Sequence, residues 1–195
     1  MASSLNLHPP QSASFVVRYS LIVIFRNMRK SLILLLLVVV LQSCTNSYTT
    51  YSNKYPVSFS CDISMPPFNG VYTLGNFLYV RQRPLKDGYT VYTNTGMAYE
   101  YPLTEVQSRV FSFGLAGLII GSPWYAEGEI YAYDLGCPQC DVPSARLVVN
   151  TTPYATCPKC GSSYELNNHG YATNGGRPLY RYPVTLNGNL LMVHN

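Results

Sequence analysis

Two Cys-x-x-Cys pairs constrain this chain more than any other feature. Cys137 and Cys140 form the first pair, Cys157 and Cys160 form the second, and sixteen residues separate them. Each short turn aims both thiols at one point, and the spacing lies in the range of zinc sites. Gly161 follows the second pair, where we expect the backbone to fold under the sulfurs and a Cβ to crowd. Two facing turns of this kind supply the four thiolates of a tetrahedral metal site.

The N-terminal part has the pattern of an export signal. From Met28 the chain carries a short basic stretch, then ten apolar residues at 32–41, then Gln42-Ser43-Cys44. A basic head, a short apolar core and small residues before a cysteine are typical of secretory signals. The apolar run is too short for a transmembrane helix, which needs about 20 residues. An uncleaved membrane anchor is the alternative.

Residues 41–44, Leu-Gln-Ser-Cys, resemble the lipobox of bacterial lipoproteins. In that family the signal is cut before the cysteine, which is then lipidated. The resemblance implies that residues 1–43 are leader and signal peptide and that Cys44 carries the lipid. Residues 1–27 hold a second apolar patch at 21–25, and a signal that starts at Met28 has an ordinary length, so we expect the true start at Met28. The polar residues up to 56 would form a tether. We therefore expect a protein of the bacterial cell envelope, held to the membrane by lipid on its periplasmic or cell-surface side.

Charge excludes one class of partner. The chain has 13 Lys and Arg and 9 Asp and Glu, but four of the basic residues and none of the acidic ones lie in residues 1–43. The remainder has 13 − 4 = 9 basic and 9 acidic residues. A balanced domain with no basic patch predicts no nucleic-acid partner.

The rest of the chain, residues 57–195, has the pattern of an all-β domain. Of the 18 tyrosines, 17 follow Cys44, and Gly and Pro punctuate short runs without a long helical period. Two-residue turns at Gly75-Asn76 and Asn187-Gly188 predict tight hairpins. The pattern predicts an antiparallel sandwich or small barrel. The expected strands are residues 71–74, 77–82, 89–93, 97–101, a stretch within 106–115, 118–121, 129–134, 146–150, 163–166, 180–186 and 189–193.

Residues 129–193 resemble the Rieske iron–sulfur domain in the order of their features. A strand leads into the first cysteine loop, a hairpin follows, and the second loop reads Cys157-Pro-Lys-Cys-Gly-Ser-Ser-Tyr-Glu. A Gly-rich stretch and a closing hairpin complete the order. The resemblance implies a Rieske-like fold with an inserted two-loop metal-binding subdomain at about residues 134–180. It departs from that family at Cys140 and Cys160, which replace its two histidine ligands. The high potential of a Rieske centre depends on those imidazoles.

The sequence leaves four interpretations of the cysteine site open. A structural Zn²⁺ fits all four cysteines and is our first expectation, and a closed four-Cys site predicts no hydrolytic chemistry. A [2Fe–2S] cluster and a lone, rubredoxin-like iron are the alternatives. The fourth is two disulfides, because an exported compartment is oxidising.

The functional expectation follows from this site. We expect a non-enzymatic structural or interaction module of the envelope, with an unidentified protein partner. An electron-transfer protein and a thiol redox protein are the alternatives. Cys61 has no partner once Cys44 is lipidated, and we expect it to be a small buried side chain. We expect His169 to be a loop residue and not a ligand.

Overall fold

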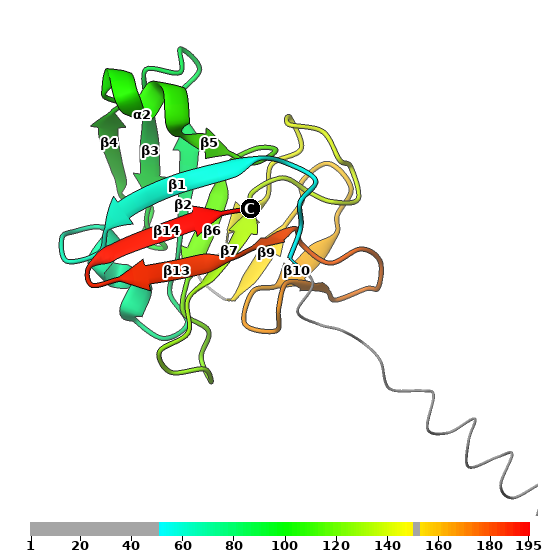
Figure 1. Cartoon of the computed structure of the whole chain (residues 1–195). Helices are drawn as coiled ribbons and strands as arrows, with labels where there is room; N and C mark the ends of the chain where they lie inside the picture. The colour runs from blue at the N-terminus through cyan, green and yellow to red at the C-terminus, as the bar shows by residue number, and fades with distance from the viewer. Residues whose placement is uncertain (1–50, 150–152) are drawn as a thin grey trace, which may run out of the picture. The chain divides into compact units, whose positions relative to one another are not determined.

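The computed structural model describes residues 51–149 and 153–195, and within them three antiparallel sheets. The largest has six strands in the order β12-β7-β6-β2-β3-β4 (Figure 1). Its members are β2 (Phe77–Gln82), β3 (Gly88–Tyr92), β4 (Ala98–Pro102), β6 (Leu118–Gly121), β7 (Tyr131–Asp134) and β12 (Arg181–Tyr182). Every residue of β6 and β7 is buried, so both faces of this sheet are covered at its centre.

The second sheet packs across one face of the first. Its order is β13-β14-β1-β5, and Figure 1 shows β1, β14 and β13 lying in front of β2, β6 and β7. Its strands are β1 (Val57–Asp62), β5 (Ser112–Phe113), β13 (Val184–Asn187) and β14 (Leu190–His194). The hairpin expected at Asn187-Gly188 joins β13 to β14, and Gly188 has the positive φ of 58° that this turn needs.

Alternation along the strands divides the core in two. Leu118 and Ile120 of β6 face the β1–β14 layer and join its core. Ile119, between them, points to the opposite face and joins a second core that contains Cys137 and Cys157. Because side chains alternate along a strand, the six-stranded sheet is the middle layer between the sandwich core and the cysteine region.

The third sheet belongs to an inserted subdomain. Its order is β11-β10-β9-β8, and all of its strands lie between β7 and β12 in the chain. They are β8 (Val148–Val149), β9 (Tyr154–Thr156), β10 (Ser163–Glu165) and β11 (Tyr171–Ala172). The fold is therefore all-β with open antiparallel sheets throughout the described residues, as the sequence predicts, and the sandwich alternative is correct. The order of strand, loop, strand pair, loop and closing hairpin agrees with the one that the Rieske resemblance implied.

Several local predictions are wrong. Residues 71–74 are not a strand, since Phe68–Tyr72 forms the 3₁₀ helix η1. The strand expected within 106–115 is present only as the short β5 (Ser112–Phe113), because the segment begins as the helix α2 (Glu105–Val110), whose capping box joins Thr104 and Gln107 through both side chains. The first strand, β1, was missed, although its residues alternate buried and partly exposed.

The segment before β1 contacts the domain. The Ser52 N–H donates to the carbonyl of Arg181 at 2.8 Å, and the side-chain amide of Asn195 donates to the carbonyls of Ser52 and Tyr55. Residues 1–50, with the predicted signal and Cys44, lie outside the described residues. Among the residues that are described, no helix has the length and apolar character needed to cross a bilayer.

Candidate metal centre

The first cysteine loop, residues 137–141, is separated by two residues from the end of β7. The Asp141 N–H donates to the Cys137 carbonyl at 2.8 Å, and the Cys137 N–H donates to the Ala145 carbonyl at 2.9 Å. Asp141 has a left-handed backbone with φ of 56°, which lets the chain reverse just after Cys140. Asp is one of the few non-glycine residues that adopt this conformation readily.

The second cysteine loop, residues 157–161, joins β9 to β10 and repeats the same design. The Gly161 N–H donates to the Cys157 carbonyl at 2.9 Å, and the Cys157 N–H donates to the Ser162 carbonyl at 2.8 Å. Gly161 has φ of 74°, the counterpart of Asp141 in the first loop. The steric reason predicted for Gly161 is wrong, because a Cβ there would meet nothing within 4 Å. Its backbone conformation is the constraint.

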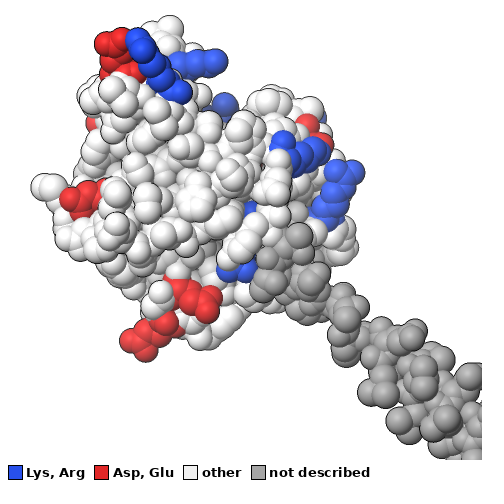
Figure 2. Space-filling model, in the orientation of Figure 1, with Lys and Arg blue, Asp and Glu red and all other residues white. Residues whose placement is uncertain are grey.

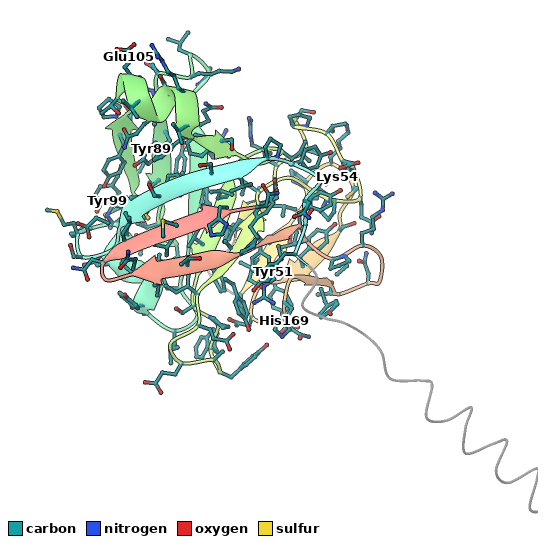
Figure 3. All side chains as sticks on the ribbon, viewed as in Figure 1. Tyr51, Lys54, Tyr89, Tyr99, Glu105 and His169 are labelled. Atoms are coloured by element: carbon teal, nitrogen blue, oxygen red, sulfur yellow. The ribbon has the colours of Figure 1, made fainter. Side chains whose placement is uncertain are left out.

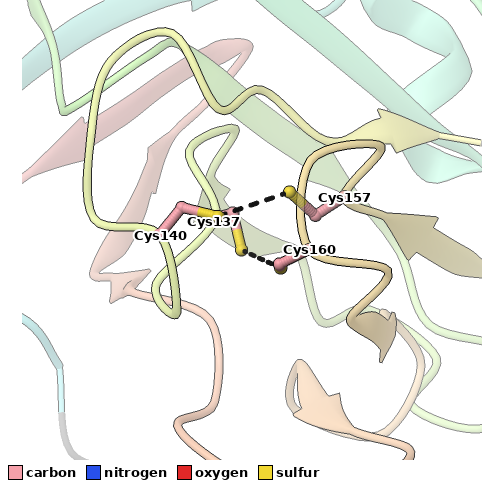
Figure 4. Close-up of side chains that lie close together, drawn as sticks. All are labelled: Cys137, Cys140, Cys157 and Cys160. Atoms are coloured by element: carbon pink, nitrogen blue, oxygen red, sulfur yellow. Dashed lines mark hydrogen bonds between the residues drawn. The ribbon is translucent and has the colours of Figure 1, made fainter.

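The two loops bring four sulfurs together, as Figure 4 shows. The Sγ atoms of Cys137, Cys140, Cys157 and Cys160 all lie within 4.8 Å of one another. The Sγ atoms of Cys137 and Cys160 are 3.6 Å apart, and those of Cys140 and Cys157 are 3.9 Å apart. These separations are well beyond the sulfur–sulfur bond length of about 2.05 Å. The structure thus holds four unbonded thiols in one cluster.

This donor set fits a single metal ion. With a metal–sulfur distance of about 2.3 Å, the sulfurs of a tetrahedral Zn²⁺ site are about 3.8 Å apart. The Cys137–Cys160 and Cys140–Cys157 sulfur separations, at 3.6 and 3.9 Å, bracket that value. Four sulfur ligands would fill a tetrahedral shell and leave no position for water, so the arrangement suits a structural or redox ion and not hydrolysis.

Burial and acidity differ across the cluster. Cys137 and Cys157 are fully buried, whereas Cys160 is exposed. Burial raises the pKa of the Cys140 thiol to about 12. The Ser162 hydroxyl lies 3.3 Å from the Cys160 sulfur and, with the Ser162 N–H, lowers the pKa of that thiol to about 6. Metal binding requires thiolates, and the lowered pKa favours the thiolate form of Cys160.

A buried tyrosine supports the cluster from the sheet side. Tyr164 of β10 is fully buried, and its hydroxyl lies 3.4 Å from the Cys137 sulfur. A hydroxyl at this distance can donate to a metal-bound thiolate and fix its orientation. Tyr164 is among the residues on which the Rieske resemblance is based, but no role was predicted for it from the sequence.

A buried carboxylate holds the approach to the first loop, and sequence reasoning missed it. Asp134, fully buried at the end of β7, accepts from the N–H groups of Leu115 at 2.6 Å and Ala116 at 3.2 Å. It also accepts from the Gly136 N–H at 2.6 Å and the Tyr182 hydroxyl at 2.7 Å. Burial raises the pKa of Asp134 to about 6, against the hydrogen bonds, which lower it. Asp134 therefore fixes the residue that precedes Cys137.

A second missed feature ties the N-terminal segment to the first loop. The Asp141 carboxylate accepts from the hydroxyls of Tyr55 at 2.8 Å and Tyr180 at 2.7 Å and pairs with the Lys54 ammonium. The ammonium also lies 5.4 Å from the ring centroids of both tyrosines. These hydrogen bonds hold the pKa of Asp141 well below its usual range. We call Lys54, Tyr55, Asp141 and Tyr180 the Asp141 clamp.

The other sequence candidates lie elsewhere. Cys61 is buried in the sandwich core, 6% exposed, and burial raises its thiol pKa to about 12, in agreement with the expected small buried side chain. His169 is a loop residue outside the four-sulfur cluster, with its Nδ1 atom 3.2 Å from an Arg181 nitrogen. Cys44 lies outside the described residues.

Comparison with known proteins adds little to this geometry. No family model matches the chain, and no curated protein matches it either. Among solved structures, a Sphingomonas yanoikuyae B1 ferredoxin is similar at 19% identity over 44% of this chain and 81% of its own, with a TM-score of 0.30. A likeness this slight carries no argument, so the assignment of the site rests on its own residues.

Proposed function

We propose that this protein is a bacterial envelope lipoprotein whose β domain holds one structural Zn²⁺ through Cys137, Cys140, Cys157 and Cys160. The observation that carries the proposal is the convergence of four sulfurs within 4.8 Å from two loops of matched backbone design. The ion would lock these loops together at the edge of the second core. The domain would then act as a rigid binding module and not as an enzyme.

The sulfur separations favour one ion over two. In a [2Fe–2S] cluster held by four cysteines, two sulfurs bind each iron. The sulfurs on different irons are therefore farther apart than those on one iron, by the width of the cluster. In this chain no pair of the four sulfurs exceeds 4.8 Å, and the pairs Cys137–Cys160 and Cys140–Cys157, at 3.6 and 3.9 Å, each join one loop to the other. A [2Fe–2S] cluster would need the two loops to move apart.

Export and lipidation rest on the sequence pattern of residues 28–44. If Cys44 is the lipidated N-terminus, only residues 45–50 separate it from the described part of the domain. Six residues reach at most about 20 Å when extended. The domain would therefore stand close to the membrane. The Asp141 clamp and Asn195 already hold residues 51–56 against the domain, so these residues add no reach.

A single iron in the same site is the second candidate, and the exposure of Cys160 favours it. A ligand at the surface places the ion close to solvent, where an electron partner can approach. Four thiolates are also the ligands of a rubredoxin-like iron, so geometry alone fits both ions. An iron-loaded protein would be coloured and reducible, whereas zinc has no redox chemistry.

The test compares one ligand with one cysteine outside the cluster. The full chain and its Cys160→Ser and Cys61→Ala variants are expressed in a bacterial host and purified from the membrane without added metal. We expect about one zinc per chain in the parent and in Cys61→Ala, and none in Cys160→Ser. A parent protein with neither zinc nor iron would contradict the metal proposal.

Lipidation has its own readout. Intact mass of the parent would show a mature chain that begins at a lipid-modified Cys44, and Cys44→Ser would lose the modification and leave the membrane fraction. An unmodified parent, or a Cys44→Ser variant that stays in the membrane, would contradict the lipoprotein proposal.

A further inference from the structure

A cavity of about 450 Å³ lies apart from the cysteine cluster, next to β7, β12 and β13. Tyr51 and His169, labelled next to each other in Figure 3, both line it. Its volume lies within the range of small-molecule sites, which are about 300–1,000 Å³. None of the four cysteines borders it, so it needs an explanation of its own.

The cavity presents a cation with no carboxylate partner. The Arg181 guanidinium lies 4.3 Å from the ring centroid of Tyr131 and 5.4 Å from that of Tyr51. Its Nη1 is 3.2 Å from the His169 Nδ1, and its buried Nε has no hydrogen-bond partner. Arg181 belongs to none of the four ion pairs found in the described residues. A cation held by rings and left unpaired is suited to an incoming anion.

The same cavity presents an anion. Glu129 lines it, is exposed, and likewise belongs to none of those four ion pairs. The Tyr131 pKa is raised to about 12, first by burial and then by Glu129, so this carboxylate lies beside the ring that carries Arg181. His169 has its pKa lowered by burial and by Arg181, so it is neutral at pH 7 and adds no charge.

The remaining wall is apolar. Ile130, Val184 and Leu186 line the cavity, and Leu186 keeps 40% of its surface exposed. On the face seen in Figure 2, charged residues are few, and red and blue residues lie together in small groups. Arg181 and Glu129 differ from such groups in belonging to none of the four ion pairs found in the described residues. A simple anion would meet Glu129, and a simple cation would meet Arg181. The lining suits a ligand that carries both charges and an apolar group.

We propose that this cavity binds a free α-amino acid with an apolar side chain. Its carboxylate pairs with Arg181, its ammonium pairs with Glu129, and its side chain lies on Val184 and Leu186. The pairing neutralises two charges that the described chain leaves apart. This inference does not depend on which metal, if any, the cysteines hold.

The test is calorimetric titration of the full mature chain with L-leucine up to about 10 mM. Two analogues each remove one charge: 4-methylpentanoate lacks the ammonium and isopentylamine lacks the carboxylate. We expect saturable binding of leucine, and at least about tenfold weaker binding of either analogue, since hydrogen bonds to charged groups contribute about 1.5–3 kcal/mol.

Variants of the protein test whether Arg181 and Glu129 bind the two charged groups of the ligand. Arg181→Gln and Glu129→Gln should each weaken leucine binding at least about tenfold, whereas Arg83→Gln, on a cation outside the cavity, should not change it. Arg181→Lys keeps the charge and should bind better than Arg181→Gln. If Arg181→Gln fails to fold, Glu129→Gln and the two analogues still test whether both charges of the ligand are bound. No saturable leucine binding, equal binding of 4-methylpentanoate, or unchanged binding in Glu129→Gln would overturn the proposal.

Discussion

Replacing Asp134 with Ala should destabilise the domain more than any other change of a charged side chain. The carboxylate is fully buried and accepts from three backbone N–H groups and one hydroxyl. The loop around it is closely fitted, because a Cβ on Gly114 would lie 2.2 Å from the Asp134 Oδ2.

The magnitude follows from the donors that the change leaves behind. Gly136 and Tyr182 are buried, so their donors would stay unpaired at a cost of about 1–3 kcal/mol each. Leu115 and Ala116 are partly exposed, and water can replace the carboxylate there. The variant should lose about 4 kcal/mol of unfolding free energy, or about 8–16 °C in Tm for a domain of this size. Because Gly136 precedes Cys137, metal affinity should fall too.

The assay is urea unfolding at pH 7 with metal bound, followed by circular dichroism. Asp87→Ala is the matched control, since Asp87 is an exposed partner of Arg83 at 3.2 Å, and such pairs contribute at most about 1 kcal/mol. A loss below about 1 kcal/mol in Asp134→Ala would refute the reasoning. So would a loss equal to that of Asp87→Ala.

Three further predictions concern the pH dependence of stability, the sandwich core and the Asp141 clamp. Because burial raises the Asp134 pKa to about 6, the folded chain binds this proton more tightly, so stability should fall by about 2–3 kcal/mol as pH rises from about 4 to 6. Urea unfolding should show this slope, and Asp134→Asn should lack it. Phe59→Ala should cost about 3–5 kcal/mol by the same assay, because Phe59 is 2% exposed and packs among four aromatic rings. Asp141→Asn keeps a residue that tolerates φ of 56° but releases Lys54, so trypsin should cut faster after Lys54 and at an unchanged rate after the exposed Lys86. Equal rates after Lys54 would contradict the clamp.

The sequence predicts the strands best where local pattern and burial agree. Residues 118–121 were placed correctly because an apolar run between glycines suits a strand buried on both faces. Asn187-Gly188 was placed correctly because its turn chemistry is local. Within 106–115 the strand prediction holds only for Ser112–Phe113 and fails for the helix α2, because the Thr104 and Gln107 cap outweighs the strand propensity of Val106 and Val110, which lie exposed there.

The candidate site divides in the same way. The four cysteines were predicted because their spacing is a local signal. Asp134 and Asp141 were missed because their partners lie as far as 48 and 87 residues away, and only the tertiary fold brings those donors to them. For Gly161 the residue was identified correctly and the reason was wrong, because its φ and not crowding requires glycine.

X-ray absorption at the metal edge of the protein purified from the membrane tests the central claim most directly. The account predicts zinc with one shell of four sulfurs at about 2.3 Å and no second metal nearby. Iron with the same single shell would move the assignment to the rubredoxin-like candidate. A short metal–metal distance would contradict the single-ion site, and the absence of any bound metal would contradict the account as a whole.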